Sequence, residues 1–555
     1  MLIKSDSYDD LYRSFSWDIP ARFNMGVDVC DRQAARNADA PALIVASGAG
    51  GTADTVTYSF GAIRALSNQA ANLFRARGLA PGDRIGVLLP QSVEAAVTHV
   101  AAWKAGLITI PLFTLFGEDA LEYRLADAGA AALITDLANL PKVDAIRDRL
   151  PDLATVLVID AGQDGGETGT VGFIDFWSEL SRASDAFTPA DTAADDPGLI
   201  IYTSGTTGNP KGALHAHRVL LGHMPAAEMF HNFLGRPGDL MWTPADWAWI
   251  GGLMNALMCS WHLGVPVVAH RARKFDPEEA LALMARLGVR NTFMPPTALR
   301  LMSKVPDIGT RYDLGLRSIA SAGEPVGAEL IHWSRDALGL TVNEFYGQTE
   351  CNIITANCAE IMPVKPGSVG RPAPGHIVDV VDEDGNVLPP DREGDLACRA
   401  PDPVMLLSYW NNPQAAEANR RGDWWVLGDR GYRDDDGYLW FVGRGDDVIT
   451  SAGYRIGPGE IEDCLSRHPA VQLAAVVGVP DPVRTEAVKA FIILMPGETA
   501  GPAIEAAIRD FVKTRLSSHE YPRLIEFVDT LPMTATGKIR RKSLRDAERA
   551  KNRPA

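Results

Sequence analysis

The sequence predicts an α/β protein with a large N-terminal domain of stacked β-α sheets, a small β-rich subdomain and a small C-terminal α+β domain. Three observations support this. Strand-like and helix-like segments alternate from residue 56, short strands with turn signals replace them after about residue 366, and a separate α/β pattern begins near residue 446. The chain has 555 residues, more than the roughly 250–300 that one hydrophobic core serves, so several cores are expected.

The N-terminal domain, residues 1–445, is predicted from the alternation. The expected segments are a strand at 83–90, a helix at 93–105, a strand at 108–112, a helix at 119–128 and a strand at 131–135. Short strands that precede Pro or Gly turns are expected at 198–202, 265–269, 291–294 and 318–321. Open α/β sheets bind ligands at the carboxyl ends of their strands, so the site is expected there.

The glycine-rich stretch 48–53 fits the dinucleotide pattern G-x-G-x-x-A, but a strand-like segment follows it at 55–58. The dinucleotide fingerprint requires a helix at this point, so we expect a hairpin turn instead.

The β-rich subdomain is expected at about 366–443 and the C-terminal domain at 446–555. The first contains a strand at 378–381 and a hairpin at 431–442 folded about an acidic turn. The second contains a helix at 458–466, strands at 473–479 and 487–495, and an amphipathic helix at 504–516.

Composition excludes several classes of function. The net charge of −17 argues against nucleic-acid partners, because a polyphosphate backbone needs a basic face. The six cysteines lack Cys-x-x-Cys spacing, which is typical of reduced thiols. No apolar run approaches the roughly 18 residues of a membrane span, and no signal-peptide pattern opens the chain, so we expect a soluble, cytoplasmic protein. The oligomeric state is not fixed by the sequence, and a homodimer is compatible with it.

A loop of hydroxyls, glycines and one lysine follows the apolar run 198–201. It reads Thr203, Ser204, Gly205, Thr206, Thr207, Gly208, Asn209, Pro210, Lys211. Glycines let backbone amides turn toward an anion, and the hydroxyls and the ammonium add donors and charge. The loop therefore predicts a triphosphate site. It is not the P-loop of ordinary nucleotide hydrolases, because two residues separate Gly208 from the lysine.

Five further motifs follow in order: Ser-Ala-Gly-Glu-Pro at 321–325, Tyr-Gly-Gln-Thr-Glu at 346–350, Gly-Asp at 428–429, Gly-Arg-Gly-Asp-Asp at 443–447 and Thr-Ala-Thr-Gly-Lys at 534–538. Together with the loop they resemble the acyl-adenylate-forming (AMP-binding) superfamily, in particular its medium-chain and acetyl-CoA synthetase-like members. The resemblance covers almost the whole chain. It implies an AMP-forming acid–thiol ligase of fatty acid metabolism that uses ATP, Mg²⁺ and CoA.

The resemblance also assigns roles. ATP binding falls to the loop residues Thr203, Ser204, Gly205, Thr206, Thr207, Gly208 and Lys211, to Gly323, Glu324 and Pro325 at the adenine edge, to Tyr346, Gly347 and Gln348, and to Asp429 and Arg444 at the ribose. Lys538 would bridge the carboxylate and the α-phosphate, Thr349 would reach the α-phosphate, and Glu350 would hold Mg²⁺. Each position also has an ordinary explanation as a turn residue or surface charge.

The second half-reaction needs access for CoA. Asp446 occupies the family's hinge position, so the C-terminal domain is expected to be mobile and to rotate between the two half-reactions. Gly453, Tyr454 and Arg455 resemble the segment that lines the channel for the CoA arm. Gly453 is equally well explained as a turn glycine.

The identity of the acid depends on fewer residues. Acetyl-CoA synthetases carry a tryptophan before Gln-Thr-Glu, whereas this chain has Gly347, which predicts room for longer acids. Segment 244–252 resembles the pocket lining of medium-chain synthetases, with Trp249 as an acyl wall and Trp247 as a wall or core residue.

A medium-chain fatty acid is favoured, and branched-chain or aromatic acids stay open. A stand-alone adenylation enzyme loading a carrier protein, a luciferase-like oxygenase and a non-catalytic binding protein are the alternatives. The binding protein is disfavoured because Lys211, Glu350, Asp429 and Lys538 are all present.

Overall fold

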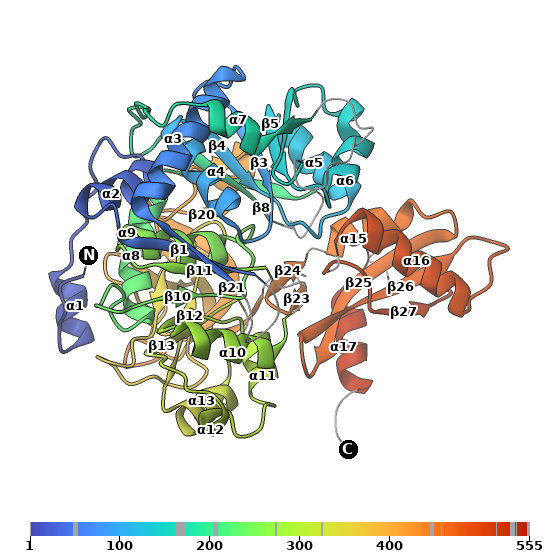
Figure 1. Ribbon diagram of the computed structural model, residues 1–555. Coiled ribbons are helices and arrows are strands. Elements are labelled where there is room, and N and C mark those ends of the chain that lie inside the picture. The colour runs from blue at the N-terminus through green and yellow to red at the C-terminus, as the bar shows by residue number, and fades with distance from the viewer. Residues whose placement is uncertain are drawn as a thin grey trace. The chain divides into compact units, whose positions relative to one another are not determined.

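The computed structural model describes residues 2–47, 54–161, 173–203, 209–271, 275–323, 326–444, 449–456, 458–517, 519–532, 539 and 541–551 (Figure 1). The chain divides into two compact units. The first comprises Met1–Thr114, Leu125–Ile201 and Ala213–Gly443, and the second comprises Leu115–Arg124, Tyr202–Gly212 and Arg444–Ala555. The second unit thus includes two short segments from the N-terminal part of the chain, which the predicted C-terminal domain of 446–555 does not contain.

Several residues of the predicted site follow strands of a sheet that we call sheet A. Over the described residues its strand order is β16-β15-β14-β13-β12-β10-β11-β1-β2. The strands are β1 (Pro41–Ala46), β2 (Thr55–Ser59), β10 (Met241–Trp242), β11 (Val267–His270), β12 (Asn291–Phe293), β13 (Ser318–Ser321), β14 (Val342–Tyr346), β15 (Thr355–Ala356) and β16 (Arg371–Pro372). From β14 to β1 neighbouring strands run parallel, so their carboxyl ends share one edge. β2 runs antiparallel to β1, which confirms the expected hairpin, although its tip at 48–53 lies outside the described residues.

A second sheet, sheet B, has the order β19-β9-β8-β4-β3-β5-β6-β7 over the described residues. Its strands are β3 (Arg84–Leu88), β4 (Ile108–Pro111), β5 (Ala132–Thr135), β6 (Thr155–Val158), β7 (Ile174–Asp175), β8 (Pro197–Thr203), β9 (Lys211–Ala216) and β19 (Ser408–Tyr409). The strands from β4 through β7 pair in parallel. The predicted β-α alternation is therefore confirmed.

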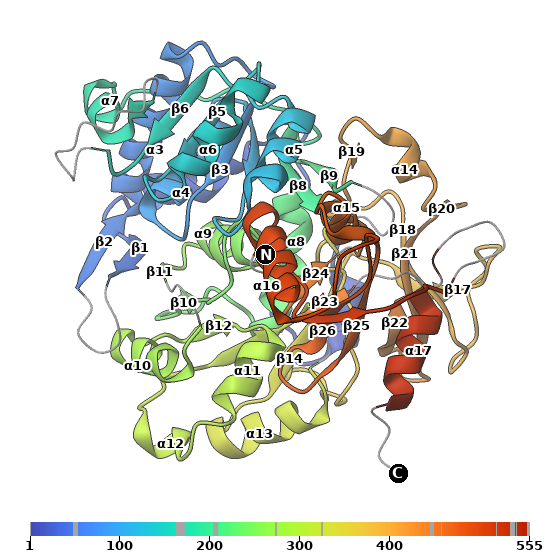
Figure 2. The same cartoon turned by 90° about the vertical axis from the view of Figure 1, so that its right-hand side faces the viewer.

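Helical segments precede and connect these strands along the chain. They are α1 (Tyr8–Ser14), α2 (Arg32–Arg36), α3 (Phe60–Ala76), α4 (Val93–Lys104), α5 (Glu118–Ala128), α6 (Leu140–Ile146), α7 (Phe176–Arg182), α8 (Val219–Phe230), α9 (Cys259–His262), α10 (Pro277–Leu287), α11 (Pro296–Met302), α12 (Ile308–Arg311), α13 (Ala328–Leu338) and α14 (Pro413–Glu417), with the 3-10 helix η3 (Arg147–Arg149) and the π-helices η1 (Val27–Asp31) and η4 (Gly251–Met258). α8 and η4 contact one face of sheet A, and α10, α11 and α13 share a core with the other, where Figure 2 shows them below the strands. Met241 belongs to the hydrophobic core on the face of α8 and η4, and Trp242 belongs to the core on the face of α10, α11 and α13, because successive strand residues point to opposite faces.

The β-rich subdomain is an antiparallel sheet, sheet C. Its described strands are β17 (Val378–Val381), β18 (Gly394–Arg399), β20 (Arg420–Arg421), β21 (Trp424–Arg433) and β22 (Leu439–Arg444). The order is β17-β18-β21-β20, and β22 pairs with β21. The expected strand at 378–381 and hairpin at 431–442 are both confirmed.

The second unit, considered alone, contains sheet D. Its described elements are β23 (Ile449–Ser451), β24 (Tyr454–Ile456), β25 (Val471–Asp481), β26 (Thr485–Leu494), β27 (Leu524–Phe527), α15 (Pro458–Ser466), α16 (Pro502–Arg515) and α17 (Arg541–Lys551). The strand order is β24-β23-β26-β25, with β27 on β26. Val477, Ala487 and Phe491 form its apolar core with Leu531. The helix expected at 458–466 is confirmed at both ends.

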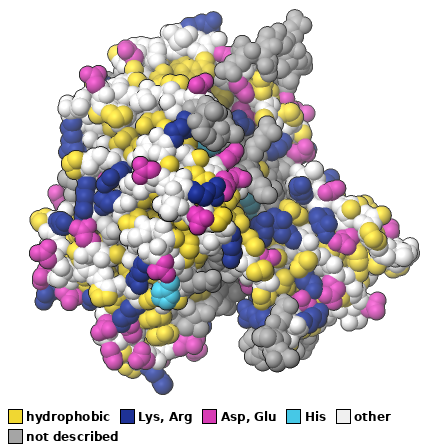
Figure 3. Space-filling model, turned by 60° about the horizontal axis from the view of Figure 1, so that its bottom comes forward, with side chains coloured by type: hydrophobic (Ala, Val, Ile, Leu, Met, Phe, Trp, Pro, Cys, Tyr) yellow, Lys and Arg dark blue, Asp and Glu magenta, His cyan; other side chains and the backbone are white. Residues whose placement is uncertain are grey.

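Other expectations from composition can be compared with the described residues. Each of the six cysteines is free and buried. No described helix is both long and apolar enough to cross a membrane. On the face seen in Figure 3, acidic and basic side chains are interspersed over the described surface.

Candidate active site

The carboxyl edge of sheet A brings together three of the segments that the sequence singled out. β14 ends at Tyr346 and continues into 347–350, β13 ends at Ser321 and continues to Gly323, and β10 leads into the segment that carries Trp249. β10, β12, β13 and β14 are parallel neighbours. The three segments therefore leave the sheet at the same edge, where open α/β sheets bind their ligands.

Tyr346, Gln348 and Asp429 form a hydrogen-bonded group. Tyr346 Oη donates to Asp429 Oδ2 over 2.5 Å, and Gln348 Nε2 donates to the same oxygen over 2.6 Å. Gln348 also donates to the carbonyl of Leu427 over 2.6 Å. Asp429 is 2% exposed, whereas Tyr346 is half-buried. The group therefore fixes a carboxylate beside an aromatic ring, with two donors that orient one of its oxygens.

A β-bulge places Asp429 in this group. The pairing of β21 with β18 jumps between Val426 and Arg430, so three residues of β21 lie opposite one residue of β18. Gly428 takes a φ of +70° within the bulge, a conformation that favours glycine. Bulges turn a side chain away from the regular alternation of a strand, which explains why a Gly-Asp pair precedes Arg430 here.

Glu350 lies two residues beyond Gln348 and is held by Tyr409. Tyr409 Oη donates to Glu350 Oε1 over 2.7 Å, and Leu406 N donates to the carbonyl of Glu350 over 2.8 Å. Burial, followed by the nearby Glu350 carboxylate, raises the pKa of Tyr409, so its hydroxyl keeps its proton at neutral pH. Tyr409 belongs to β19, which pairs with β9 at Ala213. One oxygen of the Glu350 carboxylate is therefore fixed by a neutral donor.

Trp249 stands at one end of a row of aromatic rings. The ring centroids of Trp249 and Phe293 are 5.5 Å apart, those of Phe293 and Phe345 are 5.4 Å apart, and those of Phe345 and Phe230 are 4.2 Å apart. Trp249 is half-buried and the other three are buried. Trp247 is 1% exposed, which favours its interpretation as a core residue.

Gly347 is required by the backbone around it. A Cβ added to it would lie 1.2 Å from the carbonyl oxygen of Asn352. Any side chain at position 347 would thus force the segment around Asn352 to move. The missing tryptophan does not by itself open a channel, because the carbonyl of Asn352 already fills the nearest space.

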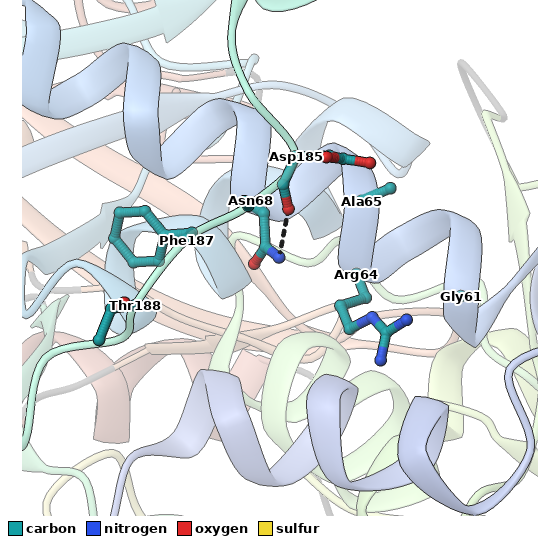
Figure 4. Close-up of a pocket in the computed structure, with 8 residues that line it drawn as sticks. Gly61, Arg64, Ala65, Asn68, Asp185, Phe187 and Thr188 are labelled. Carbon is teal, nitrogen blue, oxygen red and sulfur yellow. Dashed lines mark hydrogen bonds between the residues drawn. The ribbon is translucent and has the colours of Figure 1, made fainter.

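A cavity of about 570 Å³ opens between α3 and the segment 185–188 (Figure 4). Gly61, Arg64, Ala65, Asn68, Asp185, Ala186, Phe187 and Thr188 line it. Asn68 Nδ2 donates to the carbonyl of Asp185 over 2.8 Å, which joins the two walls. None of the predicted site residues is among these lining residues, so the cavity is separate from the predicted site.

The sequence of the whole chain matches two family models. Residues 30–410 match the model of the AMP-binding enzyme, and residues 460–538 match that of the AMP-binding enzyme C-terminal domain. The chain belongs to the AMP-binding enzyme family. This confirms the resemblance on which the site residues were chosen, and the match covers sheets A and B together with most of the C-terminal sheet.

Similar members of the family are acyl-CoA synthetases. The human acyl-coenzyme A synthetase ACSM4, mitochondrial, is 37% identical over 540 residues, which is 96% of this chain and 91% of the relative. Among solved structures, a Brucella canis acyl-CoA synthetase is 35% identical with a TM-score of 0.73 and covers 99% of this chain and 100% of its own. An anthranilate CoA ligase, AuaEII, solved with anthranoyl-AMP, is 30% identical with a TM-score of 0.71 over 96% of this chain and 99% of its own. The predicted fold class is thereby confirmed.

Several predicted residues of this AMP-binding enzyme lie outside the described structure. They are Ser204, Gly205, Thr206, Thr207 and Gly208 of the phosphate loop, Glu324, Pro325, Asp446 and Lys538, together with the side chains of Arg444 and Arg455. At the described ends of the loop, Thr203 Oγ1 donates to the carbonyl of Lys211 over 3.5 Å. Gly323 is exposed with a φ of +95°.

In the second unit, Gly453 is explained by its turn. Ala452 and Gly453 join β23 to β24 with φ of +52° and +81°. A two-residue hairpin with both φ positive favours glycine whatever ligand passes nearby. Tyr454 stacks on the ring of His519, with centroids 3.6 Å apart.

Glu344 is a candidate site residue that no motif marked. It lies on β14 two residues before Tyr346 and is 2% exposed. Its Oε1 accepts from Val326 N over 3.2 Å, and Oε2 is buried with no partner among the described residues. Burial raises its pKa to about 8. The available signal was an acidic residue inside a strand that the fold buries, since such residues are rarely buried without a purpose.

Proposed function

We propose that the chain catalyses AMP-forming ligation of a carboxylic acid to CoA, with a medium-chain fatty acid as the preferred acid. The observation that carries this is the meeting of Tyr346, Gln348 and Asp429 beside Glu350 and Tyr409 at the carboxyl edge of sheet A. Such an edge supplies an aromatic face, a fixed carboxylate and a hard oxygen ligand for a nucleoside triphosphate. The acyl-CoA synthetase relatives, which align over nearly the whole chain, support the same reaction.

The first half-reaction activates the acid as an acyl-adenylate, a mixed anhydride in which AMP is the leaving group. A carboxylate oxygen of the acid attacks the α-phosphorus of ATP, and pyrophosphate departs, leaving the acyl-adenylate. The loop from Thr203 to Lys211 would neutralise the departing phosphates. Thr349 and Lys538 would stabilise charge on the α-phosphate as it develops.

The nucleoside would lie against Tyr346. The Asp429 carboxylate is a good hydrogen-bond acceptor. The vicinal hydroxyls of a ribose are two donors whose spacing matches the two oxygens of one carboxylate. Arg444 would add a second ribose contact. Gly323, Glu324 and Pro325 would line the edge of the base, with Gly347 and Gln348 alongside. Val326, the residue after that segment, donates to Glu344.

The residues present fit a magnesium site that ATP completes. Mg²⁺ in such enzymes takes one or two carboxylates and fills its shell with water and substrate phosphates. Glu350 offers that carboxylate, one oxygen of which is fixed by Tyr409. No group of three or more His, Cys, Asp or Glu side chains that could hold a metal ion occurs among the described residues, so any ion there would depend on the phosphates. When bound, the ion supplies positive charge beside them.

The second half-reaction replaces AMP with a thiol. The CoA sulfur attacks the acyl carbonyl carbon, the bond to the AMP oxygen breaks, and a thioester forms. We place the domain boundary at 445/446 with Asp446 as the hinge, the β-rich subdomain at about 366–443, and the CoA channel at Gly453, Tyr454 and Arg455. A mobile C-terminal domain would present one face for each half-reaction.

The acid would pack against Trp249. That ring is half-buried and backed by Phe293, so it offers a largely apolar wall. Gly347 would border the same space, although the carbonyl of Asn352 limits what it opens. Branched-chain and aromatic acids stay as alternatives, the latter favoured by the structural similarity to an anthranilate CoA ligase. A stand-alone adenylation enzyme that loads a carrier protein is the other alternative.

We further propose that the protein acts in the cytoplasm on small molecules and without nucleic acid. Its oligomeric state stays open, with a homodimer as one alternative. Six free, buried cysteines suit a reducing compartment. The names of the ACSM4 relatives place those proteins in mitochondria. Cell fractionation and light scattering test location and assembly directly.

The deciding experiment measures AMP and pyrophosphate release from ATP with Mg²⁺ over acids from acetate to dodecanoate, with benzoate and isobutyrate, each with and without CoA. CoA-dependent turnover that peaks at a medium chain is the expected result. Pyrophosphate exchange without CoA-dependent turnover would instead favour a carrier-loading enzyme. Absence of exchange with every acid would contradict the proposal.

A further inference from the structure

Three buried polar side chains from three separate segments meet beside the predicted site. His223 lies on α8, Asn255 lies in the π-helix η4, and Asn352 follows β14. Their exposures are 0%, 2% and 6%. Buried amides and imidazoles are costly unless their hydrogen bonds are satisfied, so a group of three in an apolar core requires an explanation.

The hydrogen bonds of this trio fix one consistent arrangement. His223 Nδ1 lies 2.5 Å from the carbonyl of Val219, so Nδ1 carries the proton and donates. Burial lowers the pKa of His223 to about 4, which keeps the ring neutral and makes Nε2 an acceptor. Asn352 Nδ2 donates to that Nε2 and also to Asn255 Oδ1 over 3.1 Å. Both hydrogens of one amide group are thus used to join two helices.

Two members of the trio lie in segments that carry predicted site residues. Asn352 follows Glu350 by two residues, and its carbonyl fills the space beside Gly347. Asn255 stands in η4, the element that begins two residues after Trp249. π-Helical segments are costly irregularities that persist mostly at functional sites.

The third member, His223, has a rigid support. The neighbouring Gly222 has no room for a side chain, since an added Cβ would lie 2.6 Å from the backbone nitrogen of Val404. The carbonyl of Gly222 lies 3.1 Å from Nε2 of His376, and Nδ1 of His376 lies 2.8 Å from Asp402 Oδ2. α8 is therefore held against the loop at 402–404, and the trio transmits that fixed position to Asn352.

We propose that His223, Asn255 and Asn352 are positioning residues that lock the acyl wall at Trp249 to the nucleotide segment 346–350. The lock sets the shape of the acyl end of the site through the carbonyl of Asn352. This inference rests on the proposed function. It assigns the choice of acid to a buried link rather than to Gly347 alone.

The test separates the acyl end of the site from the nucleotide end by using AMP and hexyl-AMP, a non-reactive alkyl ester of AMP, as probes. Isothermal titration calorimetry gives the affinity for each probe. The affinity for hexyl-AMP divided by the affinity for AMP, which we call the tail ratio, reports the contribution of the alkyl tail. In Asn352→Ala the ratio should fall at least about tenfold, the effect of leaving a buried polar partner unsatisfied at the wall. The affinity for AMP alone should not change.

Matched variants distinguish positioning from stability. Asn343→Ala removes an equally buried amide, which donates to Phe230 O over 2.9 Å and to Asn232 Oδ1 over 3.0 Å. It should lower the melting temperature and leave the tail ratio unchanged. Asn255→Ala should reproduce the effect of Asn352→Ala, and the double variant should add nothing, because both remove the same link.

An unchanged tail ratio in Asn352→Ala and Asn255→Ala, with melting temperatures lowered as in Asn343→Ala, would overturn the proposal. The proposed function fails separately, when wild-type protein binds AMP and hexyl-AMP but makes no acyl-CoA from any acid. The ratio still decides the role of the trio in that case. Wild-type protein that binds neither probe would contradict both proposals.

Discussion

Replacing Glu344 with glutamine should stabilise the protein and flatten the pH dependence of its stability. Glu344 is 2% exposed, and burial raises its pKa to about 8 from an ordinary value of 4.5. Between these two values the folded state holds a proton that the unfolded state has lost. Stability falls with rising pH wherever the folded state binds more protons, so the carboxyl destabilises the fold over this range.

The magnitude follows from the two pKa values. Below pH 4.5 both states are protonated, and above pH 8 both are ionised, so the change is confined to the interval between them. Within this interval the free energy of unfolding of the wild type falls by about 1.4 kcal/mol per pH unit, or by about 3 kcal/mol from about pH 5.5 to about pH 8. Glutamine keeps a carbonyl that accepts from Val326 and never ionises, so this loss should vanish.

Urea unfolding at several pH values, followed by tryptophan fluorescence, measures the effect. The difference between Glu344→Gln and wild type should widen with pH. Glu417→Gln is the control, because its side chain is 78% exposed and its difference from wild type should stay constant. If the Glu344→Gln and wild-type curves run parallel, Glu344 is ionised in the folded protein and the reasoning from burial is wrong.

Three other substitutions test the site. Tyr409→Phe removes the hydroxyl that donates to Glu350 over 2.7 Å, and kcat/KM for ATP at limiting Mg²⁺ should fall about tenfold or more, as initial rates across a Mg²⁺ series would reveal. Asp429→Asn removes the charge that would hold the ribose and should raise KM for ATP by about 10- to 100-fold in pyrophosphate exchange, whereas the exposed Asp423→Asn should leave it unchanged. Trp249→Ala should raise KM about tenfold for acids of about six carbons or more and little for acetate, a contrast that an acid panel measures; equal changes for all acids would contradict an acyl wall.

The strands and helices of this protein were largely predictable because their signals are local. β13 and β17 have the bounds predicted from the sequence, 318–321 and 378–381. The helix α15 begins at Pro458, a residue suited to the first helical turn. A period of two or 3.6 residues and a breaker at each end identify such segments without knowledge of their neighbours.

The motifs also identified the family and most of the candidate residues from sequence, because those residues cluster in short runs such as 346–350. Sequence reasoning missed Glu344 and Tyr409, which stand alone. Their roles come from burial and from a single bond to Val326 or Glu350, and neither is expressed in a local pattern.

What the sequence determined by itself was the order of the elements, the family and the chemical types available to the site. What only the tertiary structure decided was which of them meet. Asp429 reaches Tyr346 across 83 residues of chain, and Asn352 reaches His223 across 129. Such contacts depend on how strands are ordered in a sheet and where one strand bulges, and pairings between distant segments leave no periodic trace in either segment.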